Sequence, residues 1–177
     1  MWIEVLLLAK LSGGPLHGYE LRKEIERSTG RTLSNNSLYP ALRRFVDAAA
    51  VTRSAQEQEA KPPRHVYTIT DVGRELLHDV LVDFPDEAAR NEAEFLARVS
   101  NFSRLTAAER TAVVDTRDRA LAAELDRLGA LVHTQDDPWS RTVLEQVCAR
   151  LTAEREWVAR LRELAADTDQ ELTRGLP

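Results

Sequence analysis

The sequence predicts a mainly α fold, with an N-terminal α+β domain followed by a C-terminal domain of antiparallel helices. Three observations support this prediction. Apolar residues recur at helical spacing over most of the chain. The alternating, β-branched pattern of strands occurs only between residues 51 and 70. Beyond residue 85 the sequence has no alternating segment, so we assign residues 1–84 and 85–177 to two domains.

The composition is that of a globular chain, with 43% hydrophobic and 30% charged residues. The apolar run Val5–Ala9 is too short for a membrane span, and Glu4 precedes it where a signal peptide would have basic residues. The single cysteine, Cys148, excludes an intrachain disulfide and a cysteine metal cluster. We therefore expect a cytoplasmic protein without membrane contact.

The net charge of −5 is unevenly distributed along the chain. Residues 1–80 hold 11 Lys and Arg against 10 Asp and Glu, whereas residues 81–177 hold 13 against 19. Binding to an anion depends on where cations cluster more than on the total charge. Any anionic partner should therefore bind to the first 80 residues.

The first 50 residues predict three helices. Trp2–Leu11 has a helical pattern that ends at the breaker of residues 12–15. A second helix runs from about Leu16 to Thr29, and Gly30 follows it at the usual position of a C-terminal cap. The third extends from residues 34–36 to about Ala49. The short turn between the last two helices is typical of a helix-turn-helix.

Residues 51–70 predict a β-hairpin. Val51–Ser54 and His65–Thr70 have the pattern of strands, and the polar segment Gln56–Pro63 has that of a loop. A helix to Phe84 follows, capped by Thr70 or by the next residue. Three helices followed by a hairpin are the layout of a winged helix-turn-helix domain.

The C-terminal domain is expected to contain long helices with narrow apolar seams. Thr106 and Glu109 form a capping box for a helix to about Val132, and Pro138 begins the last helix. Heptad spacing of the apolar residues favours coiled-coil-like pairing, within one chain, between chains, or both. The residues that we assign to a homodimer interface are Trp2, Leu144, Val147, Leu151, Trp157, Val158 and Leu161.

The third helix has a polar face opposite its apolar one. At 100° per residue, Pro40 and Arg43 lie near the pole opposite Leu38. In a helix-turn-helix the second helix enters the major groove, where Arg contacts guanine and Asn contacts adenine. A solvated face with surface arginines is the alternative. The candidate DNA contacts on this helix are Ser34, Asn35, Asn36, Ser37, Tyr39, Pro40, Arg43 and Arg44.

Pro40 is unusual within such a short helix. If Ser34 is the cap, the proline withholds a hydrogen bond from the Asn36 carbonyl. If Asn36 or Ser37 is the cap, the proline lies in or beside the first turn and costs little. We favour a start at residues 34–36 with a loosened first turn.

The hairpin tip supplies a second group of cations. Lys61, Arg64 and His65 lie at or beside it, where a wing reaches phosphates or a minor groove. The acidic residues Glu57 and Glu59 favour the alternative of an ordinary polar loop. Two basic sites at the expected places of one domain are less easily accidental than either alone.

The sequence contains no catalytic or metal-binding pattern. The four histidines lack the spacing of metal ligands, and a P-loop, a GxGxxG motif and a nucleophile elbow are all missing. Cys148 lies beside an apolar seam, which favours a buried structural thiol. We therefore expect no enzymatic activity, cofactor or metal.

The aromatic residues of the C-terminal domain allow two interpretations. Aromatic residues at helical spacing usually belong to a core or an interface. A site that stacks a small aromatic ligand is the less favoured alternative. The candidate ligand contacts are Phe95, Phe102, Trp139 and Trp157.

Three segments, GPLHGYELRKEIE, LSNNSLYPALRR and PPRHVYTITDVGRELL, follow one another within residues 3–80. In order and spacing they resemble the PadR-family transcriptional regulators. The segment EWVARLRELA more loosely resembles the longer C-terminal region of some members. The resemblance implies a dimeric winged-helix regulator, usually a repressor, on a pseudo-palindromic operator. In several relatives a small aromatic or drug-like compound relieves repression.

The resemblance also implies residue roles. It places Ser37, Tyr39, Pro40 and Arg43 on the recognition helix, and Lys61 and Arg64 on the wing. Family members commonly have a glycine after the recognition helix, where this chain has the run 47–50, DAAA. We expect this run to let the helix extend by part of a turn.

The predicted function is that of a homodimeric DNA-binding transcriptional regulator. A winged-helix module for protein contacts, without direct DNA binding, is the first alternative, because the N-terminal charge is nearly balanced. A ligand sensor in which DNA is secondary is the second.

Overall fold

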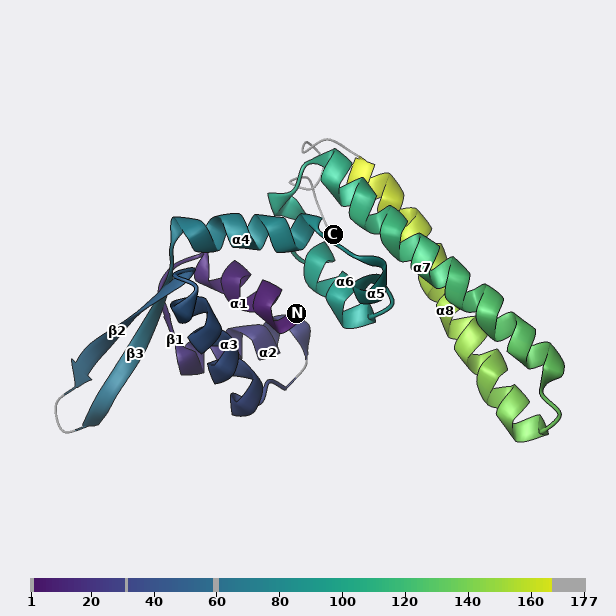
Figure 1. The fold of residues 1–177 in the computed structure, drawn as a ribbon, viewed down its shortest axis with the longest axis horizontal. Coiled ribbons are helices and arrows are strands. Elements are labelled where there is room, and N and C mark those ends of the chain that lie inside the picture. The colour runs from purple at the N-terminus through teal and green to yellow at the C-terminus, as the bar shows by residue number, and fades with distance from the viewer. Residues whose placement is uncertain (1, 31, 59–60, 167–177) are drawn as a thin grey trace, which may run out of the picture. The chain divides into compact units, whose positions relative to one another are not determined.

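The computed structural model describes residues 2–30, 32–58 and 61–166, and at residues 57, 58 and 61–63 it describes the backbone alone. Two compact units, Met1–Asp83 and Phe84–Pro177, make up the chain (Figure 1). The elements of unit 1 are α1 (Trp2–Leu11), β1 (Leu16–His17), α2 (Gly18–Thr29), α3 (Asn35–Asp47), β2 (Val51–Gln58), β3 (Lys61–Ile69) and α4 (Asp71–Val82). Those of unit 2 are α5 (Asp86–Ala89), α6 (Glu92–Val99), the 3₁₀ turn η1 (Phe102–Arg104), α7 (Ala107–Thr134) and α8 (Pro138–Ala166).

Unit 1 contains four helices, α1 to α4, and a small antiparallel sheet, which confirms the predicted winged helix-turn-helix layout. The strand order is β1-β3-β2, with Leu16 opposite Tyr67 and Val51 opposite Ile69. The first strand was not predicted. Leu16 and His17 pair with β3, so α2 begins at Gly18 and not at Leu16. The His17 N–H donates to the Glu20 carboxylate at 2.9 Å, which fixes this start.

The two strands of the wing are longer than predicted. The strand β2 extends to Gln58 and β3 begins at Lys61, so both reach into the segment 56–63 that was expected to be a loop. Gln58 lies opposite Lys61, with an irregular register beside this pair. Proline is tolerated at strand positions that lack a neighbour on one side. Because β1 pairs with only Val66 and Tyr67, residues 62 and 63 of β3 have no strand on the β1 side, and they lie in the irregularity between the pairs Gln58–Lys61 and Gln56–Arg64.

The core of unit 1 comes mainly from α1, α2 and α3. Burying one such leucine or isoleucine contributes about 1.5–3 kcal/mol relative to exposure. The core holds the helix-turn-helix against α1 and leaves the opposite face of α3 to solvent. Its fully buried side chains include Leu7, Leu8, Leu11, Leu21, Ile25, Leu38 and Leu42.

Wing and α4 meet at a close backbone contact. The Thr70 hydroxyl accepts from the Gly73 N–H at 3.1 Å and caps α4. The same hydroxyl lies 2.8 Å from the Ala49 carbonyl, to which it can donate. A Cβ on Gly73 would lie 2.1 Å from the carbonyl oxygen of Ala50. The Thr-x-x-Gly part of the sequence motif is therefore required by the packing of α4 on the end of α3.

The expected extension of α3 into the alanine run is wrong. The helix ends at Asp47, and Ala49 adopts a left-handed φ of 55°. The Ala50 N–H donates to the Phe45 carbonyl at 2.9 Å, and the Ala49 N–H donates to the Val46 carbonyl at 3.0 Å. These two bonds form a Schellman cap, which normally has glycine at the left-handed position. An alanine thus takes the conformation that favours glycine.

The first turn of α3 is regular, contrary to the predicted loosening. Ser34 is the cap, with its hydroxyl accepting from the Ser37 N–H at 3.2 Å. The Leu38 N–H donates to the Ser34 carbonyl at 3.1 Å, and the helix continues through Pro40 to Asp47. The proline removes only the bond that its own N–H would make to the Asn36 carbonyl.

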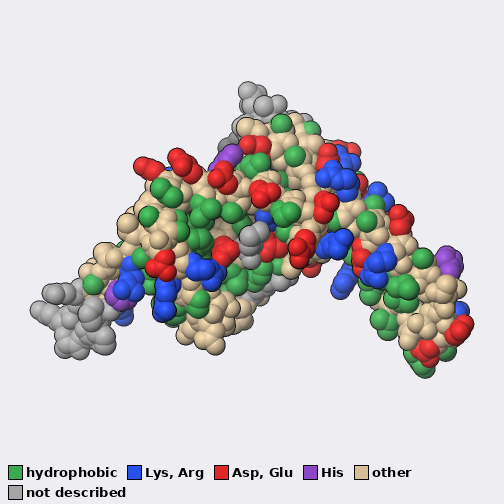
Figure 2. Space-filling model, in the orientation of Figure 1, with side chains coloured by type: hydrophobic (Ala, Val, Ile, Leu, Met, Phe, Trp, Pro, Cys, Tyr) green, Lys and Arg blue, Asp and Glu red, His purple; other side chains and the backbone are tan. Residues whose placement is uncertain are grey.

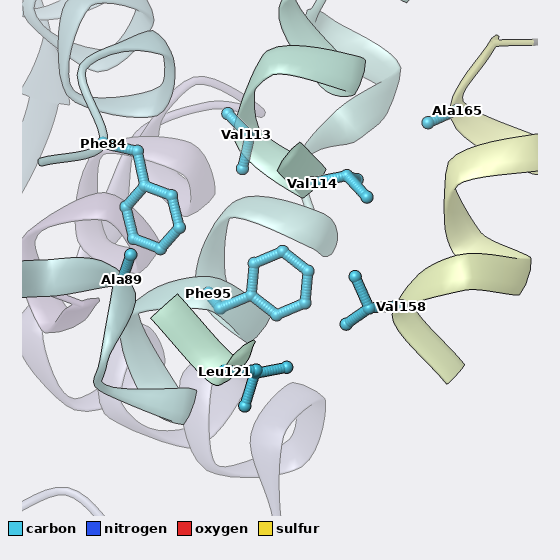
Figure 3. Packing of buried hydrophobic residues seen from close by; sticks show 8 residues of the cluster. All are labelled: Phe84, Ala89, Phe95, Val113, Val114, Leu121, Val158 and Ala165. Carbon is cyan, nitrogen blue, oxygen red and sulfur yellow. The ribbon is translucent and has the colours of Figure 1, made fainter. Parts of the chain in front are cut away.

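Unit 2 is an antiparallel helical hairpin of α7 and α8, with α5 and α6 packed on it (Figure 1). The capping box of Thr106 and Glu109 begins α7 as predicted, and Pro138 is the first residue of α8. The long helices pair within one chain, which was left open by the sequence. The buried cluster that joins the elements (Figure 3) consists of Phe84, Ala89, Phe95, Val113, Val114, Leu121, Val158 and Ala165.

Two assignments made from the sequence are corrected by this cluster. Val158 was assigned to a dimer interface, but it is 0% exposed within its own chain. Phe95 was a candidate ligand contact, but it is also fully buried, 6.2 Å from the Phe84 ring and 5.8 Å from the Trp157 ring. Heptad spacing shows that a residue lies on a seam but does not show which helix covers it. Cys148, predicted to be buried, is half-buried.

A buried arginine fastens three helices of unit 2 together. Arg117 of α7 is 2% exposed, and its Nε donates to Glu154 of α8 at 2.9 Å. Its Nη1 donates to the Ala89 carbonyl at the end of α5 at 2.5 Å. The guanidinium carbon also lies 5.7 Å from the centre of the Phe95 ring. Since a buried charge requires such partners, the pair fixes the register of α7 and α8.

Candidate nucleic-acid interface

The outer face of α3 and the base of the wing form the strongest candidate site. Figure 2 shows Lys and Arg side chains, with a histidine among them, gathered next to the grey wing tip. On α3 the apolar residues Leu38 and Leu42 are buried, whereas Pro40 and Arg43 are exposed. The predicted polarity of this helix is therefore present in the structure.

The residues at the start of α3 are ordered by local bonds. The hydroxyls of Ser34 and Ser37 lie 2.9 Å apart. Asn35 accepts at Oδ1 from Nη1 of Arg22 in α2 at 3.2 Å, which ties the two helices together. Asn36 is exposed and follows them in the first turn. The first turn thus exposes the amide of Asn36, and the bonds of its neighbours hold the turn in place before any partner binds.

The two adjacent arginines of α3 have different surroundings. Nη2 of Arg44 lies 2.5 Å from a carboxylate oxygen of Glu4 in α1, in an ion pair. Arg43 is exposed and forms no ion pair with any side chain that the structure describes. Its guanidinium is therefore available to a partner, whereas that of Arg44 is already tied to the protein.

Two hollows lie between the helices and the wing, and Tyr39 and Tyr67 line both of them. The first, which we call the α3 hollow, has a volume of about 440 Å³, and its lining includes Arg43 and Arg53. The second, the α2 hollow, has a volume of about 590 Å³. Its lining includes His17, Tyr19, Lys23, Arg64 and His65.

The predicted wing residues are only partly described. Arg64 and His65 are exposed and line the α2 hollow. The carbonyl of His65 lies 3.2 Å from Nδ1 of His17, which bridges the wing to the start of α2. The side chains of Lys61 and Glu57, and all of Glu59, lie outside the described residues.

Several residues of the site were not found from the sequence. Arg53 and Tyr67 lie on neighbouring strands, and Tyr19 and Lys23 lie on α2. Nζ of Lys23 is 5.1 Å from the centre of the Tyr19 ring. The alternation of β2 gives no signal for Arg53, because residues 52–56 are all exposed.

Burial raises the pKa of the Tyr67 phenol above its ordinary value, and the nearby Arg53 guanidinium partly opposes this shift. The phenol is therefore protonated at neutral pH. The α3 hollow accordingly contains guanidinium and phenol donors, which suit phosphate oxygens and base edges.

Of the candidate ligand contacts of unit 2, Trp139 lies apart from the other three. Trp157 packs on the buried cluster, with Phe102 partly buried against it. Trp139 is 79% exposed and lines a separate cavity of about 520 Å³ with Leu131 and Val143. Trp139 and Trp157 are 18 positions apart, which corresponds to about 27 Å along α8. The four aromatic residues therefore do not form one ligand site.

The described residues hold neither a metal cluster nor a membrane-spanning helix. No three His, Cys, Asp or Glu side chains among them lie close enough to hold a metal ion. Within the same ranges, no helix combines the length and apolar character needed to cross a membrane.

Fold and site together define a winged helix-turn-helix protein with a basic, aromatic-lined face. Residues 7–79 match the model of the transcriptional regulator PadR-like family. This matched segment forms most of unit 1, and it is the part of the chain that is similar to the family. The match agrees with the expectation that the chain is a regulator and not an enzyme.

Relatives and solved structures match different parts of the chain. It is 39% identical over 74 residues to an uncharacterised 37.1 kDa transposon protein of Streptomyces fradiae, covering 42% of this chain and 20% of that protein. It is 29% identical over 82 residues to the negative transcriptional regulator PadR of Bacillus subtilis, covering 45% of each. The chain thus spans less than half the length of these curated relatives.

Among solved structures, Bacillus subtilis PadR in complex with operator DNA has a TM-score of 0.44 and 21% identity, covering 93% of this chain and 99% of that one. A putative transcriptional regulator of Thermoplasma acidophilum has a TM-score of 0.42 and 28% identity, covering 59% and 92%.

Proposed function

We propose that the protein is a cytoplasmic transcriptional repressor that binds a pseudo-palindromic DNA operator as a homodimer. The observation that carries this proposal is the outer face of α3, where Arg43 is exposed and unpaired among the described side chains. Its neighbour Arg44 is fixed on Glu4, so the helix has one guanidinium free for a base edge. The family match to transcriptional regulators supports the same function.

In the proposed complex, α3 enters the major groove by its N-terminal half. Asn36 and Arg43 then face the bases, and Tyr39 and Pro40 lie on the same outer face. Arg53 and Arg64 lie at the sides of the hollows, where phosphates of the flanking backbone would pass. The wing, with Lys61, would reach the neighbouring backbone or minor groove.

The proposed dimer contact uses apolar residues that unit 2 leaves accessible. Trp139 and Val143 are exposed near the start of α8, and Leu144 and Val147 are half-buried beside them. Trp2, Leu151 and Leu161 are half-buried as well and remain candidates. Two copies joined in this way would present two recognition helices to successive major grooves, about 34 Å apart.

A small aromatic compound is the proposed effector that releases the operator. The cavity of about 520 Å³ at Trp139 is lined by apolar residues together with Gln135 and Ser140. An exposed indole beside apolar side chains suits a planar ring, and the polar residues suit its substituents. Quenching of tryptophan fluorescence in wild type, lost in Trp139→Phe, tests this part of the proposal.

The decisive experiment is a salt-dependent binding assay on DNA from upstream of the protein's own gene. We expect specific binding whose affinity falls linearly on a log–log plot as salt increases, because phosphate contacts release counterions. A scrambled duplex of equal length and composition is the control. Equal affinity for both duplexes, or no binding at low salt, would favour a winged-helix module for protein contacts or a ligand sensor.

A further inference from the structure

Gly18, the first residue of α2, has no room for a side chain on the side that faces α3. A Cβ built on it would lie 3.0 Å from Cε1 and 3.3 Å from Oη of Tyr39. Both distances are shorter than ordinary carbon contacts, so any side chain there would displace the tyrosine ring. The ring edge of Tyr39 thus lies directly against the backbone at the start of α2.

This contact places the Tyr39 phenol at the boundary between the two hollows. Tyr39 is 43% exposed, and it lines the α3 hollow and the α2 hollow together with Tyr67. Cations lie on both sides of this boundary, with Arg53 in one hollow and Lys23 in the other. A phenol between two basic hollows is well placed to donate to a phosphate oxygen of the DNA backbone.

We propose that Gly18 is a positioning residue for DNA binding, because its missing side chain seats Tyr39 so that the phenol donates to a backbone phosphate. This inference rests on the proposed function. It adds a residue that lies on α2, outside the recognition helix and the wing. Because Tyr39 is neutral, its contact contributes affinity without releasing a counterion.

Gly18→Ala separates binding from folding. Alanine is a better helix former than glycine, and the capping box at His17 does not use the Gly18 side chain position. We therefore expect Gly18→Ala to leave the midpoint of thermal unfolding unchanged or raise it. Operator affinity should fall about three- to tenfold, as expected for a side chain forced from its preferred rotamer. Gly13→Ala is the control, because its Cβ would meet only the Lys10 carbonyl at 3.4 Å.

A double-mutant cycle with Tyr39→Ala tests the mechanism. Fluorescence anisotropy with the operator should show that Gly18→Ala changes affinity less than about twofold once Tyr39 is removed. Tyr39→Phe should weaken binding with the slope of the salt dependence unchanged, whereas Arg64→Ala should reduce that slope. If Gly18→Ala alone fails to fold, Gly18→Ala with Tyr39→Ala should fold again, since the clash is gone.

The outcomes distinguish this inference from the proposed function. If the wild type binds the operator and Gly18→Ala binds it with the same affinity, the positioning role is overturned and the proposed function stands. An equal loss from Gly18→Ala in the presence and absence of Tyr39, or a failure of both variants to fold, also overturns it. Absence of wild-type binding overturns the function and the inference together.

Discussion

Arg43 and Arg44 are adjacent in the chain, yet the structure gives them different partners. The helical wheel placed both on or beside the outer face of α3, and it could not separate them. The ion pair between Arg44 and Glu4 joins residues 40 positions apart, so it depends on how α1 packs against α3. Local periodicity contains no information on such a contact.

We predict that Arg43→Ala weakens operator binding by about 1–3 kcal/mol and relaxes the base preference at one position of each half-site. The reason is the loss of a guanidinium that has no other partner among the described residues. Competition binding with a panel of single-base operator variants measures both effects. Arg44→Ala is the matched control and should leave the base preference unchanged. A similar loss of preference in both variants would contradict this distinction.

At the scale of elements, the sequence identified every helix of unit 1 and both strands of the wing. The strand β1 was missed, because two residues are too few to show alternation. Only its pairing with Val66 and Tyr67 in the folded chain defines β1 as a strand. The prediction also ended the wing strands too early. The prolines at 62 and 63 indicated a loop, whereas a strand with one neighbour accommodates them.

The Schellman cap after α3 leads to a stability prediction. An L-residue in the left-handed region is disfavoured by about 1–2 kcal/mol, and Ala49 has a φ of 55°. Ala49→Gly should therefore increase the free energy of unfolding by about 0.5–1 kcal/mol after the extra entropy of glycine is deducted. Chemical denaturation measures this change. Ala48→Gly, at a φ of −85°, is the control and should not stabilise the protein.

The close contact between α4 and the end of α3 predicts that Gly73 is required for stability. Gly73→Ala would place a methyl group 2.1 Å from the Ala50 carbonyl oxygen, so we expect destabilisation of at least about 1–3 kcal/mol. Gly129→Ala in α7 has no atom within 4 Å of the new Cβ, and it should stabilise by up to about 1 kcal/mol. Equal changes in the denaturation midpoint of the two variants would show that helix propensity alone determines the effect, and would contradict the clash at Gly73.

At the scale of the whole molecule, the sequence predicted a winged helix-turn-helix layout followed by helices, and the structure has this fold class. It could not decide how the seam of α8 is covered. Val158 of α8 lies in the buried cluster, whereas Trp139 at the other end of the helix is exposed. Trp139 lies off the seam that contains Val158, and the seam residues Leu144 and Val147 near Trp139 are only half-buried.

The exposed residues near the start of α8 predict how the dimer responds to mutation. Replacing Trp139 and Val143 together by alanine should weaken dimerisation by about 2 kcal/mol or more, because a buried tryptophan usually dominates such a contact. Sedimentation equilibrium measures the dissociation constant. Val72→Ala, at an exposed apolar residue of α4, is the matched control. An unchanged constant would place the interface elsewhere.

Pro40 has a consequence for local opening of the recognition helix. The ring of a proline biases the preceding residue away from helical conformations, and that residue is Tyr39. The first turn of α3 must therefore be kept helical by the Ser34 cap and by tertiary contacts, more than by intrinsic propensity. Amide hydrogen exchange in the free protein should accordingly be faster at Leu38 and Tyr39 than at Leu42 and Phe45. DNA bound at this turn, as proposed, should slow exchange at Leu38 and Tyr39 more than at Leu42 and Phe45.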